Sequence, residues 1–206
     1  MATGMMNLPK APANITPAKF FSEWLPSQVE AFKDMIGSLG GDTSAAVAFR
    51  ITGDGGGDWT TLLEKGKVKI EKGIKSDALV TVVMSATNFV EAVTGQLEDI
   101  MQPPPGTGDM TPDQAAARAK ENMEAIKSIH GSVKGVIEDD KKPFSAMVKF
   151  GGELRDEPDV TVTMERTTAL AIAKGETNPQ AAFMSGQVKI EGDLSILMQL
   201  TPILMQ

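Results

Sequence analysis

An internal repeat is the feature that most limits what this chain can fold into. When the sequence is shifted by 80 residues, Val80-Thr81-Val82 falls on Val160-Thr161-Val162. The same shift needs no gap between residues 67 and 95, and it places Val68-Lys69-Ile70 on Val148-Lys149-Phe150, Met84 on Met164, Thr87 on Thr167 and Gly95 on Gly175. β-Branched runs followed by a helix that stops at glycine predict a duplicated strand–strand–helix half. The duplication is incomplete, because nothing earlier matches residues 178–205.

Proline and glycine divide the chain into four parts. Residues 1–15 lack hydrophobic periodicity and predict a flexible tail, and residues 16–101 form the first half. Residues 102–130 hold a Pro-rich linker and a helix, and residues 131–206 form the second half. The three consecutive prolines of the linker cannot continue a helix or a central strand. Thr111, Pro112 and Gln114 then have the spacing of a capping box, which predicts that a helix begins there.

The remaining pattern alternates strands with helices. Apolar and polar residues alternate in the predicted strands, which cover residues 45–52, 59–71 with a bulge at Gly66, 79–84, 133–138, 144–150, 160–164 and 187–191. Helical spacing predicts helices near residues 16–25, 27–39, 87–94, 115–129, 167–173, 178–184 and 194–205, with a break or kink at Pro26. This order favours an α+β fold. We expect one continuous sheet, because the first half lacks a final strand of its own and would leave an open edge.

Composition excludes several classes of protein. The chain has no cysteine and one histidine, His130, so disulfides, thiolate catalysis, iron–sulfur clusters and multi-histidine metal sites are excluded. A net charge of −7 argues against nucleic acid as the main partner. The Gly53–Asp58 segment lacks the Lys-Ser/Thr of a phosphate loop and predicts a hairpin turn. We therefore expect no enzyme, no metal and no cofactor, and the absence of a signal peptide favours the cytoplasm.

The most specific stretch of the chain is its C-terminal segment. It contains Asn178-Pro179, Ala182-Phe183, Gly186, Lys189-Ile190 and Gly192-Asp193, followed by an apolar helix. This pattern resembles the C-terminal signature of the sterol carrier protein 2 (SCP2) domain family, and only Gln187 departs from the usual lysine. The first half also resembles the opening of that family, with an amphipathic helix, a Gly-rich hairpin and a strand that carries Trp59. The departure is the layout, because the family runs these elements once.

The resemblance implies both a fold and a function. The family has a mostly antiparallel sheet covered on one face by helices, here enlarged by the duplication. An apolar tunnel between sheet and helices holds fatty acids, acyl-CoA, sterols or isoprenoid-like lipids. The chain is therefore expected to be a soluble, non-catalytic lipid-binding or lipid-transfer protein. The residues expected to contact the ligand are Trp59, Phe89, Phe183, Met184, Leu197, Met198 and Gln199.

The sequence leaves alternatives open for the final helix, for the aromatic residues of the first helix and for the cavity. The final helix is apolar nearly all round, which suits a buried helix, a cavity wall, or a contact with a second copy or a membrane. An exposed aromatic patch at Phe20, Phe21 and Trp24 would also suit transient membrane contact. Finally, the second set of strands would close the cavity if it filled the space for the ligand. The chain would then be a non-catalytic accessory subunit that binds a partner enzyme.

Overall fold

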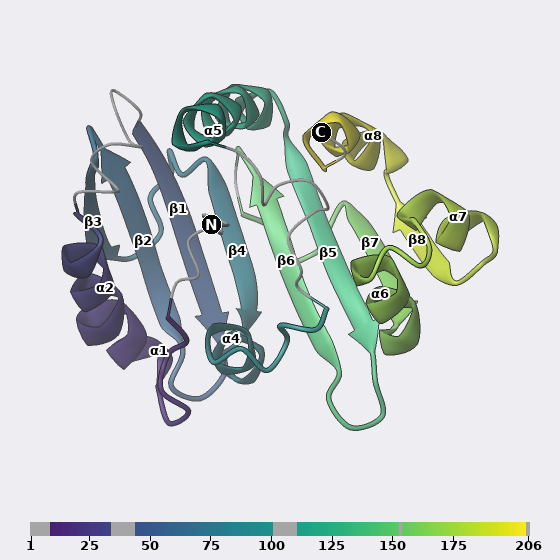
Figure 1. The fold of residues 1–206 in the computed structure, drawn as a ribbon, viewed down its shortest axis with the longest axis horizontal. Helices are drawn as coiled ribbons and strands as arrows, with labels where there is room; N and C mark the ends of the chain where they lie inside the picture. The colour runs from purple at the N-terminus through teal and green to yellow at the C-terminus, as the bar shows by residue number, and fades with distance from the viewer. Residues whose placement is uncertain (1–8, 34–43, 101–110, 153, 205–206) are drawn as a thin grey trace.

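The two halves of the chain share one continuous sheet. The structure, a computed structural model, describes residues 9–33, 44–100, 111–152 and 154–204. The sheet has eight strands in the order β3-β2-β1-β4-β6-β5-β7-β8 (Figure 1). The strands are β1 Ser44–Thr52, β2 Gly57–Glu64, β3 Lys67–Lys72, β4 Val80–Ser85, β5 Gly131–Glu138, β6 Phe144–Phe150, β7 Val160–Glu165 and β8 Val188–Gly192. Around them lie α1 Pro17–Lys19, η1 Phe20–Trp24, α2 Leu25–Ala31, α4 Ala86–Val93, α5 Pro112–Lys127, α6 Arg166–Ala173, α7 Pro179–Met184 and α8 Leu194–Leu204. The predicted α+β class is confirmed.

Two units of the sheet share one connectivity. In the first, β1 and β2 form a hairpin and β4 pairs parallel with β1; in the second, β5 and β6 form a hairpin and β7 pairs parallel with β5. All other pairings are antiparallel, so the sheet is mostly antiparallel, as predicted. The pairing of β4 with β6 joins the units. Strand β6 takes the place beside β4 that β8 takes beside β7, which closes the edge that the first half leaves open.

The constant offset of 80 residues does not hold for every strand. It is kept for β4 with α4 and for β7 with α6, which occupy equivalent places in their units. It fails for Lys67–Lys72, because β3 is an edge strand beside β2, whereas β6 lies inside the sheet between β5 and β4. By connectivity, β6 corresponds to β2 instead. The match of Val68-Lys69-Ile70 with Val148-Lys149-Phe150 therefore reflects a shared strand pattern, not a shared position.

The single long strand expected over residues 59–71 is also wrong. Residues Lys65 and Gly66 have φ angles of 49° and 72°, and the strands on either side pair antiparallel from Glu64 and Lys67 outward. Two consecutive residues with positive φ are the signature of a tight hairpin turn. A lysine at the first turn position concealed that turn, because glycine, asparagine and aspartate are the residues that usually adopt this conformation. The predicted alternation of apolar and polar residues over 67–71 lies in β3.

Strand register separates an apolar face of the sheet from a polar one. Phe49 pairs with both Trp59 and Val82, and Val148 pairs with both Val82 and Val133, so apolar side chains continue from strand to strand. Two buried clusters lie between this face and the helices. The aromatic cluster contains Phe21, Ile51, Trp59 and Phe89, and the aliphatic cluster contains Ile129, Phe150, Val160, Ile196 and Leu200. The opposite face carries threonine, lysine, serine and acidic residues together with the buried apolar residues Ala46, Ala48, Leu62 and Met147.

Helix starts agree well with the sequence. Thr16, Ser85, Thr111 and Asn178 each cap a helix through a side-chain oxygen, and the capping box of Thr111 and Gln114 is present. The π-helix η1 precedes Pro26, where the Leu25 N–H donates to the Phe20 carbonyl. Pro26 lacks an N–H and its ring would clash within a regular α-helix, so a widened turn lets the chain continue helically through Ala31.

The expected flexible tail is wrong for its described part. The Ala11 N–H donates to the Val93 carbonyl at 2.9 Å, and Ala11 is buried against α4. Lys10 forms an ion pair with Glu98 at 2.5 Å. Residues 9–15 therefore belong to the folded unit. The triple-proline linker and part of the predicted 27–39 helix lie outside the described residues, so those expectations stay predictions.

The glycine of the C-terminal motif has a structural reason. Gly192 has φ +107°, and a Cβ there would lie 2.2 Å from the Asp159 carbonyl oxygen and 3.0 Å from the Val160 Cα. Gly175 also has a positive φ, +72°, but nothing lies within 4 Å of its virtual Cβ. We expect Gly175→Ala to cost about 1 kcal/mol of unfolding free energy from backbone strain alone.

Gly192→Ala is expected to cost at least about 2 kcal/mol more than Gly175→Ala, because β7 and β8 must then separate. Urea unfolding of the two variants measures the difference, and the φ of +107° at Gly192, further from the left-handed helical region than the +72° of Gly175, adds to it. Equal losses of stability in the two variants would contradict the close approach seen here.

Candidate ligand-binding site

The seven predicted ligand residues fall into separate groups. Trp59 and Phe89 lie in the aromatic cluster and are almost completely buried. Phe21 stacks between them, with ring centroids 4.7 Å from Trp59 and 5.5 Å from Phe89. Phe20 and Trp24 stack at 5.0 Å beside the same cluster. The aromatic residues of the first helix thus pack on the sheet, and the space beside Trp59 and Phe89 is filled by rings of the chain itself.

The other five predicted residues lie on α7 and α8. Leu197 is half-buried against the aliphatic cluster, and Gln199 is exposed, with its amide donating to the Ser195 carbonyl at 3.3 Å. The remaining three are exposed together with one further leucine: 46% for Phe183, 80% for Met184, 48% for Leu194 and 74% for Met198. We call these four side chains the α7–α8 surface. The structure does not bring the seven predicted residues into one cavity.

Helix α8 is apolar on both of its sides. On its inner side Ile196 and Leu200 are buried and pack with Ile129, Phe150 and Val160. On its outer side Leu194 and Met198 face away from the core. Figure 1 shows α8 near the end of the sheet formed by β5, β7 and β8, close to α5. A helix that is apolar all round but only half covered is suited to a second apolar contact.

Two cavities among the described residues are lined mainly by polar and charged groups. The larger, of about 710 Å³, lies at the β5–β6 turn and the start of α6; it is lined by Glu138, Asp139, Asp140, Pro143, Glu165, Arg166, Thr167 and Leu170. The smaller, of about 330 Å³, is lined by His130, Gly131, Lys149, Gly152, Arg155, Asp159, Asp193 and Ile196. Neither contains a residue predicted from the sequence. Ile196 links the smaller cavity to the aliphatic cluster.

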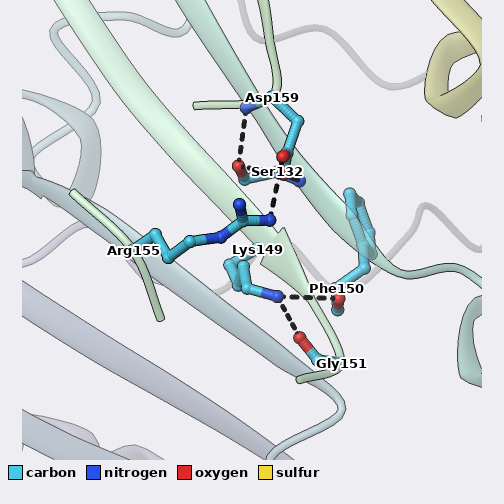
Figure 2. Close-up of polar contacts among 6 residues, drawn as sticks. All are labelled: Ser132, Lys149, Phe150, Gly151, Arg155 and Asp159. Carbon is cyan, nitrogen blue, oxygen red and sulfur yellow. Dashed lines mark hydrogen bonds and ion pairs between the residues drawn. The ribbon is translucent and has the colours of Figure 1, made fainter. Parts of the chain in front are cut away.

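A hydrogen-bonded carboxylate forms one wall of the smaller cavity (Figure 2). Asp159 Oδ2 accepts from both the Ser132 N–H and the Ser132 hydroxyl at 2.8 Å, and Arg155 Nη2 donates to Asp159 Oδ1 at 3.0 Å. The Ser132 hydroxyl bond is the main reason that the pKa of Asp159 lies below its ordinary value, and the charge of Arg155 adds to it. Asp159 is thus held as a carboxylate, and it ties β5 to the start of β7.

Lys149 forms the opposite wall. The residue is only 5% exposed, and its ammonium donates to the main-chain carbonyls of Phe150, at 3.3 Å, and Gly151. Burial is the main cause that lowers the pKa of Lys149, while the nearby charge of Asp159 opposes that shift. Sequence reasoning missed Lys149, because a lysine in an alternating strand is normally taken to face solvent. Gly152 and Arg155, which follow β6, line the same cavity as Lys149.

Metal-ligand clusters and membrane-spanning helices are both absent from the described residues. Within that part of the chain, no group of three or more histidine, aspartate or glutamate side chains is placed to hold a metal ion. No described helix combines the length and apolar character that a membrane crossing requires. His130 is exposed at the rim of the smaller cavity, with its Nδ1 3.3 Å from the Ser128 carbonyl.

Comparisons with known proteins find similarity to sterol carrier proteins. The model of the "SCP-2 sterol transfer family" matches residues 113–205, from the start of α5 into the C-terminal helix. Hydroxysteroid dehydrogenase-like protein 2 of Xenopus laevis is 32% identical over 108 residues, which cover 48% of this chain and 26% of that protein. Sterol carrier protein 2 of Gallus gallus is 42% identical over 48 residues, covering 23% of this chain and 9% of that protein. The chain thus spans about a quarter or less of these relatives.

Solved structures of similar proteins include sterol carrier protein 2 like 2 of Aedes aegypti, with 20% identity, a TM-score of 0.30, and coverage of 43% of this chain and 97% of that one. Another is sterol carrier protein 2 of Aedes aegypti in complex with the C16 fatty acid palmitate, with 19% identity, a TM-score of 0.30 and coverage of 43% and 89%. The family match and the Asn178–Asp193 motif fall on the same elements, α7, β8 and α8. Residues 113–205 of this chain are therefore similar to the SCP-2 sterol transfer family.

Proposed function

We propose that this chain is a non-catalytic lipid-binding protein that holds an elongated hydrophobic ligand between α8 and the sheet. The observation that carries the proposal is the two-sided apolar character of α8. Its inner residues Ile196 and Leu200 cover the aliphatic cluster, and its outer residues Leu194 and Met198 are exposed. The matched family supports this function, and the related Aedes protein was solved with palmitate.

The energetics favour a ligand that replaces contacts of α8. An acyl chain of about a dozen methylenes gains on the order of 10 kcal/mol on leaving water, before the costs of association and ordering. The two cavities described above are lined by charged groups, so the route proposed for the acyl chain is displacement of α8 from the aliphatic cluster. Leu197 is half-buried against the aliphatic cluster, and it then contacts the ligand together with the inner residues Ile196 and Leu200 of the same helix.

The direct test is mass spectrometry of the purified protein under native conditions and after organic extraction. A co-purifying lipid of defined mass, or uptake of added palmitate at one molecule per chain, supports lipid binding. Failure to take up fatty acids, sterols and isoprenoid lipids contradicts the proposal.

Movement of α8 provides a second prediction. The chain has no cysteine, so Met198→Cys creates a unique labelling position on the outer side of α8. We expect the emission of an environment-sensitive fluorophore at this position to shift when palmitate binds. The same label at Lys67→Cys, exposed on edge strand β3 at the far end of the sheet, serves as the control and is expected to stay unchanged. Equal responses at both positions would argue against a local displacement of α8.

A specific observation also favours the accessory-subunit alternative. The α7–α8 surface exposes four large apolar side chains, as a protein-binding surface does. In this alternative the chain binds a partner enzyme through that surface and takes up no lipid. The double variant Met184→Glu with Met198→Glu is then expected to lose capture of the enzyme from the native host. If the chain is a lipid carrier instead, the unaltered protein takes up one palmitate molecule per chain with no partner present.

A further inference from the structure

We propose that the outer edge of β3 is a docking site for an extended protein segment in which acidic residues alternate with apolar ones. Strand β3 is the last strand at one end of the sheet, and α8 lies toward the other end (Figure 1). The docking site is therefore separate from the proposed lipid site and does not depend on lipid binding.

The main chain of β3 offers unpaired hydrogen-bonding groups. A two-residue turn joins β2 to β3, and hydrogen-bonded residue pairs alternate with non-bonded pairs along the two strands. The Gly73 N–H donates to the Asp58 carbonyl at 2.8 Å, so Gly73 belongs to a bonded pair. By this alternation, the main-chain groups of Val68, Ile70 and Lys72 point away from β2, and no described residue pairs with them. An added strand would satisfy these groups.

The side chains of β3 define which strand fits. Lys67 and Lys69 are exposed on the sheet face opposite the helices. Val68 and Ile70 are half-buried on the other face, where Ile70 packs against the aromatic cluster. A strand paired with this edge places its own side chains on the same two faces, opposite those of β3. Acidic side chains at alternate positions then face the two lysines, and the apolar side chains between them contact Val68 and Ile70.

The positive charge at this edge is only partly balanced. Glu71, the acidic residue of β3, lies 2.9 Å from Lys75 and 3.8 Å from Lys69. Lys67 and Lys72 are exposed, and among the described residues no carboxylate lies within ion-pair distance of either. Lysines on an edge strand repel neutral and basic strands, which protects against unspecific pairing. A strand that supplies carboxylates removes this repulsion, so the same lysines select an acidic partner.

An extended acidic segment fits the edge better than two other occupants. An anionic membrane would attract the lysines but leave the outward main-chain groups of β3 without partners. A second copy of β3 would place the same excess of lysine on both sides of the contact, and like charges opposite each other destabilise a strand pair.

The experiment is an NMR titration of the full chain with the end-blocked peptide Thr-Thr-Val-Glu-Val-Glu. We expect the largest amide shifts at the three outward residues of β3. Lys67→Thr combined with Lys69→Thr keeps residues that favour strands, and we expect it to bind the peptide roughly fivefold more weakly. Lys189→Thr removes an exposed lysine from the edge strand β8 and is the matched control, which should keep the affinity.

A second peptide separates strand pairing from simple charge attraction. It carries the same charges, but both valine nitrogens are methylated and cannot donate hydrogen bonds, so we expect it not to bind. Equal affinity for the two peptides, or amide shifts that spare β3 in the unaltered protein, overturns the proposal. Binding of phosphatidylserine vesicles without binding of the peptide also overturns it. So does a dimer in light scattering that the double lysine variant abolishes.

Discussion

Replacing Phe21 with alanine is expected to lower the free energy of unfolding by about 3–5 kcal/mol, the largest effect predicted here for a single side chain. Phe21 is 2% exposed and lies at the centre of the aromatic cluster. Its ring centroid is 5.1 Å from Phe20, 5.2 Å from Phe49, 4.7 Å from Trp59 and 5.5 Å from Phe89. Removal of this ring leaves a cavity that the rigid sheet beneath it cannot close.

Phe183→Ala is the matched control, because it deletes the same ring at an exposed position of α7. We expect it to change stability by less than about 1 kcal/mol. Thermal unfolding followed by circular dichroism distinguishes the two, since 3–5 kcal/mol corresponds to a decrease in Tm of roughly 10 °C for a chain of this size. Similar small losses in both variants would show that the aromatic cluster is not part of the stable core.

Replacing Asp159 with alanine is expected to cost about 2–4 kcal/mol, the second largest effect. The change leaves the N–H and hydroxyl of Ser132, a residue 2% exposed, without their acceptor. It also frees Arg155. Asp156→Ala removes an exposed carboxylate from the same segment and is expected to be nearly neutral. Urea unfolding at pH 7 measures both, and a loss at Asp156 as large as that at Asp159 would contradict the role of the Ser132 contacts.

The contribution of Asp159 has a defined pH dependence. The folded state lowers the pKa of this carboxyl below its ordinary value, so the unfolded chain binds the proton more readily. The stabilisation is therefore complete above the unfolded pKa of about 3.9 and is lost as the pH falls through the lower folded pKa. The stability difference between the unaltered protein and Asp159→Ala should shrink in this acidic range. A stability difference between the two proteins that stays constant through this pH range would contradict the lowered pKa of Asp159.

Much of the local structure follows from short-range rules that the sequence carries. Alternation of apolar and polar residues identified β6 over its observed bounds, and cap residues such as Thr111 and Asn178 identified where helices begin. These signals are local, because a side chain that caps a helix or faces a core does so within a few residues. The C-terminal motif is local as well, and it predicts the similarity to the SCP-2 sterol transfer family that residues 113–205 show.

The structure decided what depends on residues distant in sequence. The turn at Lys65-Gly66 separates β2 from β3, and the β4–β6 pairing joins the units, because strand neighbours are selected by the whole sheet. Met184 and Met198 are exposed although their residue type predicts burial.

Lys149 is buried although its strand position predicts exposure. Its ammonium donates to the carbonyl of Gly151, the residue that follows β6. Burial is a property of what packs above a residue, so only the tertiary structure reveals it.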